Sequence, residues 1–190
     1  MNPPVRLGQP RVPPLPESDW TDEQRALLGT DKNPLGALNI FRTLIRHLEL
    51  YRPFMKFGRQ VLFRSSLSPR ERELVILRVG WRCGAAYEFH QHTRIGKAAG
   101  LTDAEIERVK SGPDAPDWTA LESALLRAVD ELHDDSFIGD ATWKQLSNHY
   151  DTQQLIDLVF LVGHYTMIAM ALNSLGVQIE SGQGNGPAIG

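Results

Sequence analysis

An all-α fold is predicted by three features of this 190-residue sequence. Helix-start signals recur along the chain, no segment shows the alternating pattern of a strand, and half of the 12 prolines fall within the first 16 residues. Because proline fixes φ and removes a backbone donor, residues 1–17 are expected to form an extended arm. Residues 181–190 are Gly-rich and are expected to form a tail. This leaves 18–180 as a single helical domain, which suits the chain length.

The clearest helix start is "SPRE" at residues 68–71, which combines Ser68 as N-cap, a proline at the first position and Glu71 at the third. "TDAE" at 102–105 repeats this capping box just after Gly100, which tolerates the positive φ found at helix ends. The last predicted helix is apolar on nearly every side, so we expect it at the centre of the bundle or at a subunit interface. The same signals predict helices near 21–29, 36–49, 53–65, 69–82, 84–99, 103–110, 117–133, 140–148 and 152–175.

The composition narrows the classes of partner and compartment. A net charge of -3 shows no strong excess of either sign, so nucleic acid is not an expected partner. Cys83 is the single cysteine, which excludes an internal disulfide and suits a reducing compartment. The first residues lack the apolar core of a signal peptide, and Asp157 and His164 interrupt the most apolar run. We therefore expect a cytoplasmic protein with no membrane span.

Residues 85–92, "AAYEFHQH", place a carboxylate and two histidines in a segment otherwise suited to burial. Charged side chains are seldom buried without a partner or a function. Glu88 and His92 are four residues apart, so on one helix they share a face and can meet, whereas His90 points elsewhere. A carboxylate beside an imidazole can orient its tautomer, as a general acid or base requires.

Glu73 lies on the preceding predicted helix. Whether it reaches Glu88 depends on a break near "RCG", where Gly84 would let the chain turn. If Glu73, Glu88 and His92 converge, they can move protons, and one of the carboxylates should have a raised pKa. The alternatives are an exposed helix pair for Glu88 and His92, and a first-turn acid near the helix start for Glu73.

Three stretches carry a resemblance to a known family: "NIFRTLIRH", "RSSLSPRERELVILRVGWRCGAAYEFHQHTRIGKAAGLTDAEIERV" and "LVGHYTMIAMALNSLGV". Together they resemble the carboxymuconolactone decarboxylase family, which includes the alkylhydroperoxidase D-like proteins. The resemblance covers roughly residues 38–178 and is strongest over 67–109. It implies an antiparallel bundle of helices and a homo-oligomer, either a trimer or a hexamer.

The peroxidase branch of that family carries a glutamate, then Cys-x-x-Cys, then a histidine four residues past the second cysteine. Glu73 and His92 match the outer positions, but Ala85 and Glu88 stand where the cysteines would be. Cys83 lies two positions too early and has no second thiol, so dithiol peroxide reduction is not expected. The pattern is similar instead to the decarboxylase-like branch, whose chemistry is proton transfer on a lactone acid.

The candidate substrate-binding residues are polar groups near these positions. An arginine can bind a substrate carboxylate bidentately, but it can equally belong to a surface ion pair. A buried histidine or tyrosine needs a hydrogen-bond partner, which a second core residue or a substrate can supply. The candidates are Tyr87, Arg42, Arg78, His164 and Tyr165.

The sequence indicates no cofactor. It contains no Gly-rich phosphate loop, so no organic cofactor is expected. A metal site is not expected either, because the histidines of His-x-His diverge on a helix and no HExxH motif is present.

The leading hypothesis is an enzyme that acts on a small carboxylated or lactone substrate by general acid/base catalysis. In this hypothesis His92 transfers the proton, Glu88 orients the imidazole and Glu73 is a second, buried carboxylate. One alternative is a peroxide-reducing protein that uses Cys83 with an external thiol. The other is a non-catalytic oligomeric binding protein that shares the bundle and lacks the chemistry.

Overall fold

The computed structural model describes residues 5–29 and 34–180, and the regular structure in these ranges is entirely helical. The predicted all-α fold is therefore confirmed. Short 3-10 turns at Glu17–Asp19 and Pro34–Ala37 accompany the α-helices. The α-helices are α1 Asp22–Leu28, α2 Asn39–Leu44, α3 Leu48–Phe63, α4 Pro69–Arg82, α5 Ala86–Ala98, α6 Asp103–Ser111, α7 Ala120–Asp135, α8 Asp140–Ser147 and α9 Thr152–Leu175.

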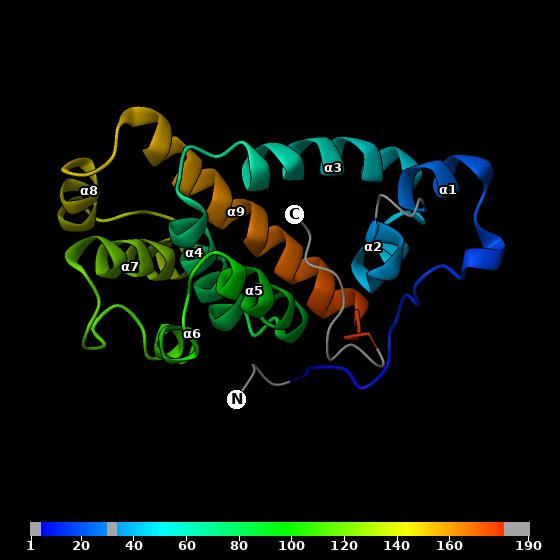
Figure 1. Ribbon diagram of the computed structural model, residues 1–190, viewed down its shortest axis with the longest axis horizontal. Coiled ribbons are helices and arrows are strands. Elements are labelled where there is room, and N and C mark those ends of the chain that lie inside the picture. The colour runs from blue at the N-terminus through cyan, green and yellow to red at the C-terminus, as the bar shows by residue number, and fades with distance from the viewer. Residues whose placement is uncertain (1–4, 30–33, 181–190) are drawn as a thin grey trace.

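The longest helix, α9, crosses the middle of the molecule, with α3 on one side and α4 and α5 on the other (Figure 1). The main hydrophobic core lies where α4, α7 and α9 meet, and Ile76, Leu125 and Leu161 from these three helices are completely buried in it. Burial of apolar surface is the main stabilising contribution to such a core. The charged residues of α4 and α5 therefore lie next to this main hydrophobic core.

By length and composition α9 could cross a membrane, because its apolar window has a mean hydropathy of 1.9. The prediction that Asp157 and His164 break this apolar segment short of the length of a membrane span is therefore wrong. Half of that window is buried inside the bundle, as in the core helix of a soluble protein. Asp157 accepts hydrogen bonds from the backbone N–H and the hydroxyl of Ser66, at 2.6 and 2.7 Å. This carboxylate therefore anchors the loop that leads into α4.

The predicted helix starts and turns around α4 and α5 are confirmed. Ser68 and Thr102 cap α4 and α6 with the reciprocal bonds of a capping box. Gly84 has a φ of +59° and Gly100 a φ of +92°, so each occupies the backbone region that favours glycine. The turn at Gly84 reverses the chain and lays α5 against α4.

The predicted helix boundaries within residues 36–65 are wrong. The chain is not helical at 45–47, where one continuous helix over 36–49 was expected, and α3 begins at Leu48 rather than near Pro53. His47 caps α3 by accepting a hydrogen bond from the N–H of Leu50, at 3.3 Å. Pro53 lies in the second turn, where it removes a single backbone hydrogen bond, so its presence did not mark the helix start.

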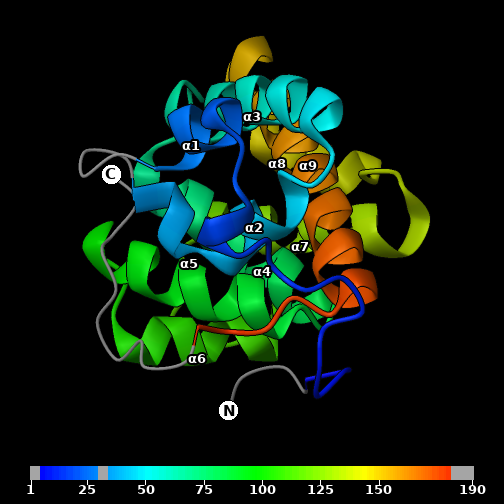
Figure 2. The same ribbon diagram turned by 90° about the vertical axis from the view of Figure 1, so that its right-hand side faces the viewer.

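Residues 5–16 have no regular structure and pack against their own chain. Figure 2 shows this segment passing the carboxyl end of α9. The N–H groups of Arg11 and Val12 donate to the carbonyl of Leu175, at 2.9 and 3.1 Å, and the N–H of Leu15 donates to the carbonyl of Arg42. Residues 1–4 of the predicted arm and the predicted tail, 181–190, lie outside the described residues.

Candidate functional site

Close packing of α4 against α5 places the carboxyl group of Glu88 at the surface of α4. A Cβ atom at Gly80 would lie 3.3 Å from Oε1 of Glu88 and 3.3 Å from the backbone nitrogen of Phe89. Both distances are tighter than ordinary van der Waals contact, so a larger residue would push the helices apart. Gly80 therefore lets Glu88 come against α4, the helix that also carries Glu73.

Glu73 and His92 form a buried hydrogen-bonded pair. The Nδ1 atom of His92 lies 2.7 Å from Oε2 of Glu73, whose side chain is completely buried. The other oxygen of Glu73 accepts a bond from Nε of Arg72, at 3.3 Å. An ionised carboxylate only accepts hydrogen bonds, so beside it Nδ1 of His92 carries the proton. The unprotonated Nε2 of the neutral ring is then free to accept a proton from another molecule.

The predicted pairing of Glu88 with His92 is wrong. Glu88 is 2% exposed, and neither of its oxygens has a hydrogen-bond partner among residues 5–29 and 34–180. The helical spacing placed both side chains on α5, but it could not include the carboxylate that α4 brings to the imidazole. Burial without a partner raises the pKa of Glu88 well above its ordinary value. A raised pKa was expected for one of the carboxylates if the three residues converge, and the raised pKa of Glu88 comes from burial alone.

Tyr165 of α9 closes the cluster. Its ring meets that of His92 edge-on, with the ring centroids 5.0 Å apart, and its side chain is buried. The pKa of Tyr165 is raised well above 10, mainly by burial and then by the negative charges of Glu73 and Glu88. Both carboxylates are therefore within electrostatic reach of one phenol, so the cluster joins α4, α5 and α9.

The two candidate arginines hold the fold together. Arg78 binds Asp130 bidentately, at 2.8 and 2.7 Å, and donates to the carbonyls of Val109 and Lys110. These bonds tie α4 to α6 and α7 and occupy the guanidinium that was expected to bind substrate. Arg42 donates from Nε to the carbonyl of Leu15, at 3.0 Å, and so holds the N-terminal segment. Neither contact is the surface ion pair given as the alternative, because Arg78 is a buried ion-pair member and Arg42 bonds a backbone carbonyl.

His164 faces α3 rather than the Glu73–His92 pair. Its ring lies 5.7 Å from the ring of Phe54 and 5.1 Å from that of Phe57. Burial lowers the pKa of His164 to about 4, so the ring is neutral near pH 7. Its Nδ1 atom has no hydrogen-bond partner in the part of the chain that the structure describes.

Tyr87 is buried and points toward the C-terminal segment, residues 176–180. Its hydroxyl donates to Oε1 of Glu180 at 2.6 Å. Burial and then the charge of Glu180 raise the pKa of Tyr87. No pattern in the sequence indicates this contact, because the two residues are 93 positions apart and Glu180 lies beyond the resembling stretches.

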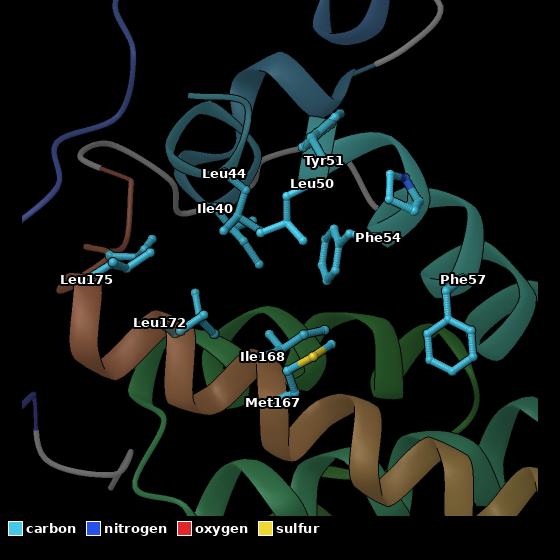
Figure 3. Close-up of a pocket in the computed structure, with 13 residues that line it drawn as sticks. Ile40, Leu44, Leu50, Tyr51, Phe54, Phe57, Met167, Ile168, Leu172 and Leu175 are labelled. Carbon is cyan, nitrogen blue, oxygen red and sulfur yellow. The ribbon is translucent and has the colours of Figure 1, made fainter. Parts of the chain in front are cut away.

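An apolar pocket with a volume of about 260 Å³ lies between α2, α3 and α9. Figure 3 shows Phe54 and Phe57 directed from α3 toward α9, where Met167 and Ile168 face them. This pocket was not predicted from the sequence, although the apolar residues of 40–57 at helical spacing were a usable signal. The lining residues are Ile40, Leu44, Leu50, Tyr51, Pro53, Phe54, Phe57, Met167, Ile168, Ala171, Leu172, Leu175 and Val177.

Cys83 is partly buried at the carboxyl end of α4, with its sulfur 3.7 Å from Nδ1 of His133. Burial and then the charge of Glu88 raise the pKa of this thiol. The reactive thiolate is therefore disfavoured. Within residues 5–29 and 34–180, no group of three or more His, Cys, Asp or Glu side chains is placed to hold a metal ion.

Known structures share this fold. The alkylhydroperoxidase core of a peroxidase-related protein from Ralstonia eutropha superposes with a TM-score of 0.76 and 17% identity, covering 90% of this chain and 93% of that one. A peroxidase-related protein from a Silicibacter species gives 0.75 and 18%, covering 94% and 93%. The debrominase Bmp8 gives 0.74 and 13%, covering 90% and 92%. Identities this low establish the fold and leave the chemistry open.

The sequence comparisons agree with the fold. No curated protein matches the chain. Residues 49–131 match the model of the carboxymuconolactone decarboxylase family, and this range contains α4, α5 and the residues Glu73, Glu88 and His92. Over residues 49–131 the chain is therefore similar to the carboxymuconolactone decarboxylase family.

Proposed function

We propose that this protein is an enzyme that moves a proton on a small carboxylated or lactone substrate. The observation that carries the proposal is the buried, unpartnered carboxyl group of Glu88, which lies one turn of α5 before His92 of the Glu73–His92 pair. A buried polar group without a partner costs about 1–3 kcal/mol, and an apolar side chain of similar shape would avoid that cost. Groups of this kind cluster at sites that perform acid/base chemistry.

The contacts divide the roles among the three residues. Glu73 is a positioning residue, because it holds Nδ1 of His92 and leaves Nε2 available. His92 is the general base, which removes a proton from the carbon next to the substrate carbonyl. The electron pair of the broken C–H bond moves into the carbonyl and forms an enolate. Glu88, kept protonated by its raised pKa, returns a proton to carbon, and exchange with water then removes the proton from His92 and restores that of Glu88, so the cycle needs no oxidant or reductant.

The same groups suit a decarboxylation. In that case the carbon–carbon bond to the carboxylate breaks, carbon dioxide leaves, and its electron pair remains in the enolate of the lactone. Glu88 then protonates the enolate carbon and recovers its own proton from water. The raised pKa of Glu88 supports both versions, because a general acid must hold its proton near the working pH.

Peroxide reduction through Cys83 is supported less well. The thiol has a raised pKa, and the sequence has no second cysteine to resolve an oxidised sulfur. The peroxidase-related neighbours share the fold at under 20% identity, so they do not change this comparison.

A turnover screen of small lactone acids and hydroperoxides tests the proposal. We expect turnover of a lactone acid, with kcat/KM lowered about 10²–10⁴-fold in His92→Ala and in Glu88→Gln, the range typical of general acid/base groups. Glu73→Gln should lower it about 10–100-fold, as the loss of a positioning partner does. The matched control is Glu49→Gln on the exposed side of α3, which should retain full activity.

Three results would overturn the proposal. Lactone-acid turnover that persists in both His92→Ala and Glu88→Gln would remove these residues from the chemistry. Hydroperoxide turnover with a thiol donor, abolished by Cys83→Ser, would assign the site to thiol chemistry instead. No turnover of any substrate class would favour the non-catalytic binding protein.

A further inference from the structure

The carboxylate of Glu180 is held by three donors from two helices. It accepts hydrogen bonds from the hydroxyl of Tyr87 at 2.6 Å, from Nε2 of Gln91 at 2.8 Å and from the backbone N–H of Asn39 at 2.7 Å. Tyr87 and Gln91 are 5% and 8% exposed. Three donors around one carboxylate form a complete anion-binding arrangement, with strong charge-assisted bonds.

The donors and the acceptor belong to different kinds of segment. Tyr87 and Gln91 lie one turn apart on α5, and each directly precedes a residue of the proposed acid/base cluster, Glu88 or His92. Glu180, by contrast, belongs to the C-terminal segment, which follows the end of α9 and has no regular structure. The donors are thus fixed by a packed helix, whereas their acceptor is carried by an irregular segment that can separate at lower cost.

The apolar pocket between α2, α3 and α9 adjoins this carboxylate. Ile40 donates its N–H to the hydroxyl oxygen of Tyr87, at 3.4 Å, and its side chain lines the pocket. Val177, three residues before Glu180, lines the same pocket. The pocket wall is almost entirely apolar (Figure 3). The carboxylate of Glu180 and the apolar pocket therefore lie next to each other along α2, where Asn39 binds the carboxylate and Ile40 lines the pocket.

We infer that Tyr87, Gln91 and the N–H of Asn39 form a carboxylate-binding site that Glu180 fills in the free protein. A small carboxylic acid with an apolar body displaces Glu180, places its own carboxylate on the three donors and its body in the pocket. The exchange leaves no donor unpaired. Burial of the apolar body of the acid then favours the bound ligand over Glu180, by about 25 cal/mol for each Å² of apolar surface buried. As a description of the substrate class the inference rests on the proposed function, but the binding itself does not require turnover.

Calorimetric titration of the full chain tests the inference. The probes are phenylacetate, its uncharged amide, and acetate, which lacks an apolar body. A tethered carboxylate competes at a high effective concentration, so its removal must strengthen binding of a true substitute. In Glu180→Ala we expect phenylacetate to bind at least about tenfold more tightly than in the wild type, and much more tightly than the amide or acetate.

The controls separate binding from folding. Tyr87→Phe in the Glu180→Ala background should lose most of the gain, because it removes one donor, and Glu49→Ala should not change the wild-type affinity. If Glu180→Ala does not fold, as judged by circular dichroism, Glu180→Gln replaces it, because the amide oxygen retains an acceptor. Equal phenylacetate affinity with and without the carboxylate of Glu180 would overturn the inference and leave Glu180 as an anchor of the C-terminal segment.

The inference and the proposed function fail separately. Titration in a Glu88→Gln background isolates binding, because the proposed general acid is absent. Tight phenylacetate binding without lactone-acid turnover would leave the carboxylate site standing and overturn the proposed chemistry. Turnover that depends on His92, together with a phenylacetate affinity that does not change in Glu180→Ala, would support the proposed chemistry and overturn the carboxylate site.

Discussion

Glu88 is a carboxyl group whose ionised form the fold disfavours strongly, because it is buried without a partner. Its pKa in the folded protein is raised above the ordinary value of 4.5 by burial. Between these two pKa values the folded protein binds more protons than the unfolded chain, so the free energy of unfolding falls as the pH rises. This contribution to stability is complete below about pH 4.5 and is lost as the pH rises toward the folded pKa.

Glu88→Gln should therefore be more stable than the wild type at pH 8, by about 1.4 kcal/mol for each pH unit above 4.5 until the folded pKa is reached, because the amide does not ionise in the unfolded chain. The two proteins should converge toward pH 4.5, where the wild-type carboxyl group is protonated in both states. Urea unfolding at several pH values measures the difference, with Glu49→Gln as the exposed control. A stability difference that does not change with pH would contradict the assignment of a raised pKa to Glu88.

Residue types and helical spacing predicted part of the site, whereas contacts between helices could not be predicted in this way. Glu73, Glu88 and His92 were found because charged residues in an apolar helical segment are unusual. The partner of His92 was assigned wrongly, because spacing along α5 says nothing about which side chain α4 presents. Glu180 was missed for the same reason, since its donors are far away in the sequence.

At the scale of elements, local signals succeeded where a cap decides the structure. The starts of α4, α6 and α9 were predicted because the N-cap and its partner lie within four residues of each other. The break between α2 and α3 was missed because it depends on the imidazole of His47 rather than on a common cap residue. Proline gave the wrong boundary, because a helix tolerates it in the early turns.

Arg78 should be the most important polar connection between helices, since it joins α4 to α6 and α7. Arg78→Ala leaves two carbonyl groups without this donor and Asp130 with only the 3.5 Å contact to Nε of Arg82, and we expect it to lower the free energy of unfolding by about 3 kcal/mol. Arg127→Ala removes an exposed ion pair with Asp114 and should cost less than about 1 kcal/mol. Thermal and urea unfolding compare the two variants. Equal losses would show that the buried bidentate pair has no special weight.

For the whole molecule, the outward face of α9 is the most informative surface. Ile156, Phe160, Met167 and Met170 are between 49% and 64% exposed, and they repeat at helical spacing. Phe57 of α3 extends this apolar face, with its ring 6.3 Å from that of Phe160. A contiguous apolar surface of this kind marks an interaction site in most proteins. The two faces of α9 therefore have separate roles, one in the core and one available for association.

The apolar face of α9 leads us to expect a homo-oligomer, and light scattering at micromolar concentration should give a mass of at least three 21.3 kDa chains. Met170→Lys, at the most exposed of these four positions, places a charge where a neighbouring chain would bury it and should shift the mass toward that of one chain. Gln153→Lys is the matched control, because residue 153 is an exposed polar position on the same helix. A wild-type protein that runs as a single species of 21.3 kDa would contradict the prediction. If Met170→Lys keeps the wild-type mass, the association instead uses another surface, and the exposed side of α9 must be explained by a different partner.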